Sequence, residues 1–165
     1  MRLLQVFHCL IFSLLLTACD TGDLPTIRNG DPAPAFTLER LDGSPLRFPE
    51  QYRGQVVALR FWADWCPYCY GEMKALEPVY RRRHKEGLVI LAVNVMQPPE
   101  TVRRFVDELG LSYEIALDRQ GEVMRLYQVM GLPVTLIIDR QGAVRSRILG
   151  ESSPEVFEQA IAGWL

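Results

Sequence analysis

The sequence predicts an α/β domain in which helices flank a central mixed sheet. Apolar segments of strand length alternate with segments whose apolar side chains recur at helical spacing. A hairpin pattern precedes this alternation, and two strands around a short turn follow it. The residues after an apolar leader are numerous enough for one domain with a proper core.

The first predicted elements are a hairpin, a buried strand and a long helix. Residues 35–38 and 45–48 form the hairpin, because residues 41–44 (LDGS) between them favour a turn. Residues 56–62 are apolar apart from one arginine and form a strand. Residues 66–84 follow as a helix with its apolar side chains on one face, and a proline inside it favours a bend.

The second half of the domain continues the alternation. Residues 88–95 are almost continuously apolar, which is typical of a central strand covered on both faces. A helix over residues 99–109 follows, and Gly110 ends it. The remaining predicted elements, in chain order, are a strand (113–117), a short helix (122–128), two strands (134–138 and 143–149) and a closing helix (154–165).

Residues 1–18 look like a secretory signal peptide. Arg2 supplies the positive end, and the apolar run over residues 3–16 is shorter than the about 20 residues that a membrane-spanning helix needs. A buried N-terminal helix is the alternative. The signal ends in Leu16-Thr17-Ala18-Cys19, which resembles the lipobox of bacterial lipoproteins, where cleavage precedes a cysteine that becomes lipid-modified.

This resemblance implies that residues 19–30 are a lipidated tether and that residues 31–165 form the folded domain. Lipid on Cys19 would anchor the chain at a membrane, because each buried methylene contributes about 0.8 kcal/mol. Asp20 resembles the signal that retains proteobacterial lipoproteins at the inner membrane. The expected location is the periplasmic face of that membrane, in a Gram-negative host.

The C-x-x-C motif of Cys66 and Cys69 carries the expected chemistry. Cys9 leaves with the signal peptide and Cys19 carries lipid, so the pair supplies the two remaining thiols. At a strand-to-helix junction such a pair is typical of a redox site. If Cys66 begins the helix, unpaired backbone N–H groups and the helix dipole lower its pKa and make it the nucleophile. Cys69, one turn into the helix, then resolves the mixed disulfide.

Two other uses of the pair remain open. A structural disulfide is one, although a bridge across so short a loop constrains little chain entropy. A zinc site is the other, but zinc takes four ligands, and the mature chain offers two thiols and His84. We therefore expect no metal and no cofactor besides the redox-active disulfide. A formal charge of −2 and the absence of long basic runs argue against a nucleic-acid partner.

Three blocks of sequence together resemble one known family: residues 30–38 (GDPAPAFTL), 61–69 (FWADWCPYC) and 131–135 (GLPVT). They are similar to the membrane-tethered TlpA/ResA-like thiol–disulfide oxidoreductases. The resemblance implies a thioredoxin-like fold with an N-terminal β-hairpin extension. It also implies disulfide exchange with client proteins, as a reductant supplied by a membrane electron donor. Clients of the cytochrome c maturation type follow by analogy.

The same resemblance implies roles for residues near the cysteines. Pro133 is expected to have a cis peptide bond and to pack opposite the pair, with an ordinary trans proline as the alternative. The backbone of Leu132 then pairs with an extended client segment, as in strand addition. Trp65, Pro67 and Tyr68 complete the expected client groove.

Glu72 and Arg60 bear on proton transfer. Glu72 lies three residues after Cys69, on the same helix face, and matches a family glutamate that could exchange a proton with that thiol. An exposed helix glutamate is the alternative. Arg60 stands six residues before Cys66, where many cytosolic thioredoxins have a buried aspartate, and it cannot serve as a base. It is predicted to pair with Asp64 or Glu72, or to extend to solvent.

Three other functions compete with the reductant. A thiol oxidase is one, because a low pKa at Cys66 would destabilise the disulfide. A thiol peroxidase is another, since residues 32–36 also resemble peroxiredoxins. Those enzymes place a threonine three residues before the reactive cysteine, where this chain has Ala63. A non-enzymatic lipoprotein that binds partners through the groove is the third.

Overall fold

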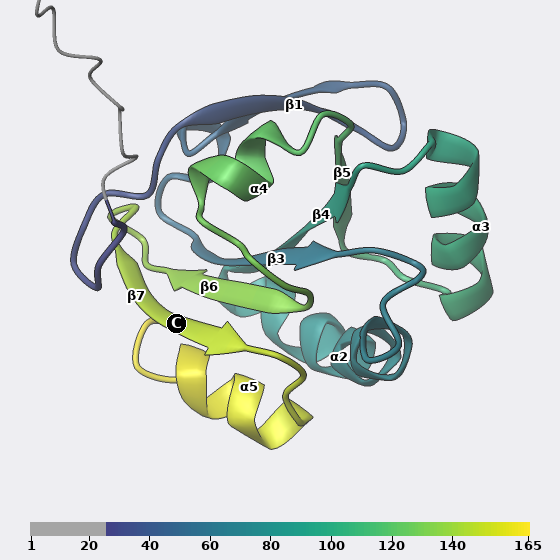
Figure 1. The fold of residues 1–165 in the computed structure, drawn as a ribbon. Coiled ribbons are helices and arrows are strands. Elements are labelled where there is room, and N and C mark those ends of the chain that lie inside the picture. Colours follow the sequence, from purple (N-terminus) through teal and green to yellow (C-terminus); the bar gives the residue numbers. More distant parts are fainter. Residues whose placement is uncertain (1–25) are drawn as a thin grey trace, which may run out of the picture.

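The computed structural model of the chain describes residues 26–165 (Figure 1). The predicted signal peptide (1–18) and the predicted lipidation signals, Cys19 and Asp20, lie outside the described residues. Among the helices of residues 26–165, none has the length and apolar character required to cross a membrane.

A seven-stranded sheet forms the centre of the domain. Its strands in chain order are β1 (Phe36–Arg40), β2 (Pro45–Phe48), β3 (Val56–Trp62), β4 (Leu88–Val95), β5 (Glu114–Asp118), β6 (Val134–Ile138) and β7 (Val144–Leu149). Their spatial order is β2-β1-β5-β4-β3-β6-β7. β4 pairs parallel with β3 and with β5, and the other neighbouring strands pair antiparallel. The sheet is therefore mixed, as predicted.

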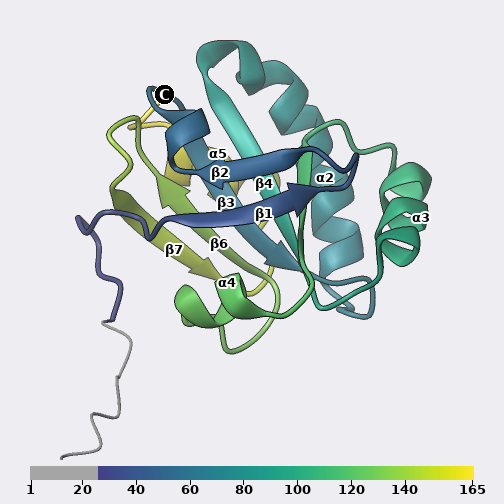
Figure 2. The same ribbon diagram turned by 90° about the horizontal axis from the view of Figure 1, so that it is seen from above.

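Helices cover both faces of this sheet (Figures 1 and 2). They are η2 (Glu50–Tyr52), α2 (Cys69–Arg83), η3 (His84–Glu86), α3 (Pro99–Leu109), α4 (Glu122–Leu126) and α5 (Pro154–Ile161). Apolar side chains of α2, α3 and α5 share one buried cluster, and α4 contributes to the cluster on the other face. Figure 2 looks from the α4 side and shows α2 behind the strands. The predicted α/β architecture is confirmed.

The N-terminal hairpin is part of the sheet rather than an appendage. β1 and β2 pair antiparallel, and the end of β1 pairs with β5. Phe36 on β1 stacks on Phe48 on β2 with 5.0 Å between ring centroids, and the rings of Phe36 and Tyr127 form a T-shaped pair with 5.8 Å between centroids. These aromatic contacts close the α4-side core, which explains why the hairpin folds back onto the domain.

The side chains of β3 alternate between the two cores. The α4 side receives Val57, Leu59 and Phe61, and the α2 side receives Val56, Ala58 and Trp62. Since successive strand residues point to opposite faces, Arg60 belongs to the α2 side. The fold therefore places a guanidinium group in an apolar layer beneath α2.

The two ends of β3 meet different parts of the chain. Near its beginning, Val57 pairs with Ile138, and the segment before β1 joins the sheet close by. There Gly30 N–H donates to Val144 C=O at 2.7 Å, and Pro32 forms a bridge with Ala143. We call residues 30–33 and 138–144 the tether end, and residues 62–69 and 132–134 the cysteine end. The chain thus joins the domain opposite its cysteine pair.

Candidate active site

Cys66 and Cys69 form a disulfide between the end of β3 and the beginning of α2. Their Cα atoms are 5.4 Å apart. Cys66 N–H donates to Ala63 C=O at 3.3 Å, and Cys69 N–H donates to Cys66 C=O at 3.1 Å. Two consecutive turns therefore carry the chain from the strand into the helix.

The helix begins later than the sequence predicts. α2 starts at Cys69 rather than Cys66, and Tyr68 is its N-cap residue. Pro67 belongs to the preceding turn, which is closed by the hydrogen bond from Cys69 N–H to Cys66 C=O. Proline is tolerated there because the turn requires no hydrogen bond from the N–H that proline lacks. Cys66 consequently lies just ahead of the helix N-terminus, and Cys69 is the first helical residue instead of lying one turn inside.

The disulfide is buried between exposed aromatic side chains. Cys66 is 1% exposed and Cys69 is fully buried, whereas Trp65 is 65% and Tyr68 56% exposed. The motif therefore presents aromatic surface to solvent while its sulfur atoms are covered.

Pro133 lies at the same end of the sheet as the disulfide. The Leu132–Pro133 peptide bond is cis, and the following residue, Val134, pairs with Phe61 at the end of β3. Pro133 C=O accepts a hydrogen bond from Gly150 N–H at 2.9 Å. A hollow of about 550 Å³ opens beside this proline, and its lining includes Met130, Leu132, Leu149 and Gly150. The role of Leu132 and Pro133 toward a client remains a prediction.

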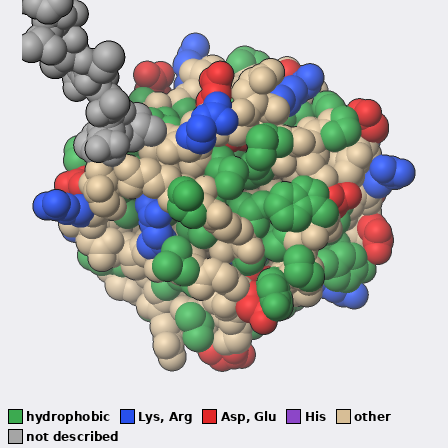
Figure 3. All heavy atoms as spheres, in the orientation of Figure 1, with side chains coloured by type: hydrophobic (Ala, Val, Ile, Leu, Met, Phe, Trp, Pro, Cys, Tyr) green, Lys and Arg blue, Asp and Glu red, His purple; other side chains and the backbone are tan. Residues whose placement is uncertain are grey.

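Large apolar side chains are exposed around the cysteine end. We call them the apolar rim, and they are Trp65, Tyr68, Met96, Met130 and Leu149. Each is more than half exposed, and Met130 is 93% exposed. Figure 3 shows hydrophobic side chains gathered on one part of the face drawn. Such a cluster on the surface of a folded domain is typical of a surface that binds other proteins.

Arg60 and Glu72 form a buried ion pair next to the cysteine helix. Arg60 Nη1 donates to Glu72 Oε1 at 2.8 Å, and Nη2 donates to Oε2 at 2.5 Å. Both side chains are 1% exposed. Arg60 Nη1 also donates to Thr135 Oγ1 at 2.9 Å, and Ser152 Oγ donates to Glu72 Oε1 at 2.8 Å. Every one of these side chains therefore contributes to one connected network.

This network decides between the alternatives left by the sequence. Arg60 pairs with Glu72, so the predictions of an Asp64 partner and of an arginine extended to solvent are wrong. Asp64 instead accepts a hydrogen bond from the Gln97 amide, and its N–H donates to Gln97 Oε1 at 2.9 Å. The prediction of an exposed Glu72 is also wrong, because its side chain is buried and its carboxylate is paired with Arg60. Proton exchange between Glu72 and Cys69 remains a prediction.

Sequence reasoning missed Thr135, Ser152 and Gln97. Thr135 carried a usable signal, since it is the polar residue in the otherwise apolar strand β6 and lies two residues after Pro133. Ser152 and Gln97 gave none, because each lies in a polar loop and finds its partner 80 or 33 residues away. Contacts of that range depend on the fold.

The described residues do not bring together a zinc site. His84 lies at the far end of α2 from Cys69, where its ring nitrogen contacts Tyr80 C=O and Arg81 C=O. In residues 26–165, no three His, Cys, Asp or Glu side chains lie close enough to hold a metal ion.

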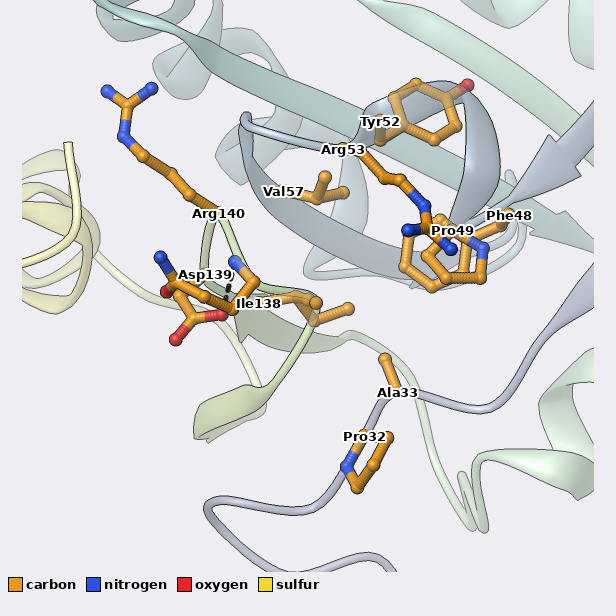
Figure 4. A pocket seen from close by; sticks show the side chains of 12 residues that line it. Pro32, Ala33, Phe48, Pro49, Tyr52, Arg53, Val57, Ile138, Asp139 and Arg140 are labelled. Carbon is orange, nitrogen blue, oxygen red and sulfur yellow. Dashed lines mark hydrogen bonds between the residues drawn. The ribbon is translucent and has the colours of Figure 1, made fainter.

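A further cavity, of about 440 Å³, lies at the tether end (Figure 4). The buried side chains of Val57 and Ile138 contribute to its wall, and Figure 4 shows Asp139 and Arg140 across from Pro49. None of the residues predicted for the redox site lines this cavity. It is therefore separate from the candidate active site.

Comparisons with known proteins agree with the geometry. The AhpC/TSA family model matches residues 29–147. The thiol-disulfide oxidoreductase ResA of Geobacillus thermodenitrificans is 40% identical over 130 residues, which are 79% of this chain and 74% of that protein. The ResA protein of Bacillus cereus is 32% identical over 79% of this chain and 75% of its own length.

Solved structures give the same result. A DsbE-type thiol:disulfide interchange protein from Chlorobium tepidum superposes with a TM-score of 0.77 at 29% identity, covering 83% of this chain and 97% of that chain. StoA from Bacillus subtilis superposes with a TM-score of 0.67 at 25% identity, covering 79% and 98%. Since the fold, the cysteine pair and the sequence relatives agree, the chain belongs to the ResA-like thiol–disulfide oxidoreductases of the thioredoxin superfamily.

Proposed function

We propose that this chain reduces disulfides in client proteins outside the cytoplasm. The observation that carries the proposal is a Cys66–Cys69 disulfide at the same end of the sheet as a cis proline and the apolar rim. A dithiol in this position is reached by a client segment that lies across the rim. The relatives named for thiol–disulfide exchange support the same chemistry.

Reduction of a client proceeds in two exchanges. The Cys66 thiolate attacks one sulfur of the client disulfide, and the other client sulfur leaves as a thiolate. Cys69 then loses its proton and attacks the Cys66 sulfur, which releases the second client thiolate and forms the Cys66–Cys69 disulfide. Two electrons pass to the client, and a membrane donor returns the pair to the dithiol. Cys66 takes the first role because it lies just ahead of the α2 N-terminus.

The apolar rim and the hollow beside Pro133 select extended client segments with bulky apolar side chains. Trp65 and Tyr68 flank the cysteines, and Leu132 offers backbone groups next to them for strand-like pairing. By analogy with the family, the clients are proteins of the cytochrome c maturation type. Apolar segments around a cysteine pair would suit the hollow lined by Met130 and Leu149.

The proposed location is the periplasmic face of the inner membrane. The Leu16-Thr17-Ala18-Cys19 sequence supports lipid attachment at Cys19, and Asp20 supports retention at that membrane. Labelling with radioactive palmitate tests the anchor: we expect label on the natural chain and none on Cys19→Ser. Label on Cys19→Ser would contradict the assignment.

An insulin-reduction assay tests the exchange itself. Cys66→Ser and Cys69→Ser should each abolish turnover, because neither variant can complete both exchanges. Unchanged turnover in both variants would overturn the proposed function. In the Cys69→Ala variant, clients should accumulate as mixed disulfides with Cys66. Trapping through Cys69 in the reciprocal variant, and not through Cys66, would reverse the two roles.

The direction of electron flow is tested by the potential of the Cys66/Cys69 couple. Equilibration with glutathione or dithiothreitol buffers gives this potential directly. We expect a value well below the about −120 mV of a strong oxidant. A value near that figure would make the chain a thiol oxidase instead.

The AhpC/TSA match raises peroxidase activity as a second candidate. Ala63 argues against it, because this buried apolar residue stands where peroxiredoxins have the threonine hydroxyl that assists the reactive cysteine. Consumption of hydrogen peroxide by the reduced protein tests the point. We expect no rate above that of free dithiol, and a rate far above it would favour the peroxidase.

A further inference from the structure

The hollow beside Pro133 combines apolar walls with a single charge. Among the described residues that line it, Arg147 alone carries a charge. Met130 and Leu149 give it large, exposed apolar side chains. Glu151, which follows the lining in the sequence, is not part of it. A segment that enters the hollow therefore meets apolar surface and one guanidinium group.

Backbone carbonyl groups hold Arg147 at the hollow. It lies on β7 opposite Leu136 of β6, so its side chain is on the α4 side of the sheet. There Arg147 Nη2 donates to Tyr127 C=O at 3.0 Å, and Nη1 donates to Gln128 C=O at 3.5 Å. Both carbonyl groups lie where α4 ends. They fix the guanidinium in place but leave its positive charge unbalanced, because a carbonyl group has no net charge.

The guanidinium of Arg147 has no carboxylate partner within residues 26–165. Arg145 on the same strand differs, since it binds Asp139. A guanidinium has five N–H donors in a planar fork that matches both oxygens of a carboxylate. The two carbonyl groups occupy only some of these donors. Arg147 is also partly buried, so a carboxylate brought by a ligand would bind it out of reach of much of the solvent.

We propose that this hollow binds an acidic residue of the client, so that the chain prefers disulfides flanked by an apolar segment that carries a carboxylate. The proposal deepens the proposed function and rests on it, because the same client must exchange its disulfide with Cys66. Apolar side chains of the client pack against Met130 and Leu149, and its carboxylate binds Arg147. Arg147 thus determines specificity and takes no part in the exchange steps.

The test compares peptides that differ in one side chain. Each peptide holds a single disulfide between a fluorophore strand and a quencher strand, and the full chain, reduced beforehand, opens it. One series carries glutamate in turn at each position near the cysteine, and the matched series carries glutamine there. At the position that reaches the hollow, glutamate should raise the second-order rate constant about fivefold, as expected for one partly exposed ion pair. Equal rates at every position would overturn the proposal.

Variants of Arg147 assign the preference to its charge. Arg147→Gln should bring the glutamate-to-glutamine rate ratio to about one, and Arg147→Glu should favour lysine at the same position. Arg147→Lys should keep part of the preference, because it retains the charge but not the planar fork. Arg53→Gln is the matched control: it removes an exposed arginine at the tether end and should leave the ratio unchanged. A preference that survives in Arg147→Gln, or disappears in Arg53→Gln, would contradict the assignment.

If the Arg147 variants do not fold, the natural chain decides the question. In about 1 M sodium chloride, where charges are screened beyond about 3 Å, the rate ratio should fall towards one. A ratio that does not respond to salt would refute the proposal, because the preference would not depend on charge. The same assay measures the exchange itself. Failure to reduce any peptide would sink the proposed function, whereas reduction without a preference for glutamate would refute only the role of Arg147.

Discussion

Two buried carboxylates, Glu72 and Asp139, each bind an arginine at opposite ends of the sheet. The partners of Glu72 come from 12 to 80 residues away and belong to different elements. The partners of Asp139 lie within six residues of it: the N–H groups of Gln141 and Ala143 and the guanidinium of Arg145. The carboxylate–arginine pair at the tether end therefore closes a single turn. The pair at the cysteine end joins elements that are far apart in the sequence.

The difference also shows in exposure. Arg60 is 1% exposed, whereas Arg145 is 32% exposed and also lies over the Trp164 ring, 4.7 Å from its centroid. Water can solvate the charge of Arg145 when its carboxylate partner is removed, but it cannot reach the charge of Arg60. Substitutions in the fully buried, long-range pair should therefore lower the free energy of unfolding much more than substitutions in the local pair.

The largest effect is expected from Glu72→Leu, which leaves Arg60 buried without a counter-ion. The free energy of unfolding should fall by about 3–5 kcal/mol. Arg60→Met/Glu72→Leu should recover most of the loss, since an apolar pair can replace a buried ion pair at little cost. Urea denaturation of the oxidised chains measures both. A double variant as unstable as the single one would show that packing, rather than charge, sets the cost.

A smaller effect is expected from Asp139→Asn, about 2 kcal/mol, because the asparagine oxygen still accepts the backbone N–H groups. Burial raises the pKa of Asp139, but hydrogen bonds from Ala143, Arg145 and Gln141 outweigh this and leave the pKa below its ordinary value. Stability from this carboxylate is therefore present above about pH 3.9 and lost as the pH falls through the lowered native value.

Urea denaturation at a series of acid pH values checks this dependence. The natural chain should lose more stability on acidification than Asp139→Asn, whose side chain does not titrate. Parallel losses in the two proteins would show that Asp139 contributes no pH dependence. The redox site should be unaffected in either case, because the partners of Asp139 are all local.

Ser152→Ala should cost about 1 kcal/mol, since it removes one of several hydrogen bonds to the Glu72 carboxylate. Arg60 still holds both oxygens, so the carboxylate does not lose its counter-ion. Thermal unfolding measures the loss. A cost as large as that of Glu72→Leu would mean that the serine, and not the guanidinium, fixes the carboxylate.

The smallest effect is expected from Arg145→Gln, below about 1 kcal/mol, because a partly exposed ion pair contributes little. Asp139 keeps its two backbone N–H donors in this variant. Urea denaturation of this variant alongside Glu72→Leu and Arg60→Met/Glu72→Leu makes the comparison between the two ends direct. A loss above about 3 kcal/mol would remove the contrast between the two ends of the sheet.

The sequence predicted the fold well because its signals are local. The continuous apolar character of residues 88–95, the turn between β6 and β7 and the spacing of the cysteines each depend on a few neighbouring residues. The start of α2 was misplaced because Pro67 suits both a tight turn and a first helical turn. In the structure Pro67 lies in a tight turn, which the hydrogen bond from Cys69 N–H to Cys66 C=O closes.

The candidate site was predicted in part. The cysteines and Pro133 belong to sequence blocks that are specific enough to identify without a structure. The choice between Asp64 and Glu72 as the partner of Arg60 was not accessible, because it depends on which face of β3 lies beneath α2. The contribution of Ser152 depends on how β7 and α5 return to the cysteine end, which no local pattern encodes.

The attachment of residues 30–32 to the beginning of β7 has a consequence for reach. β3 separates this attachment from the cysteine end by roughly 20 Å, the length of a seven-residue strand. A lipid, a linker or a fused fluorescent protein placed upstream therefore meets the domain on its far side. The cysteine end therefore faces away from whatever is attached upstream of residue 30.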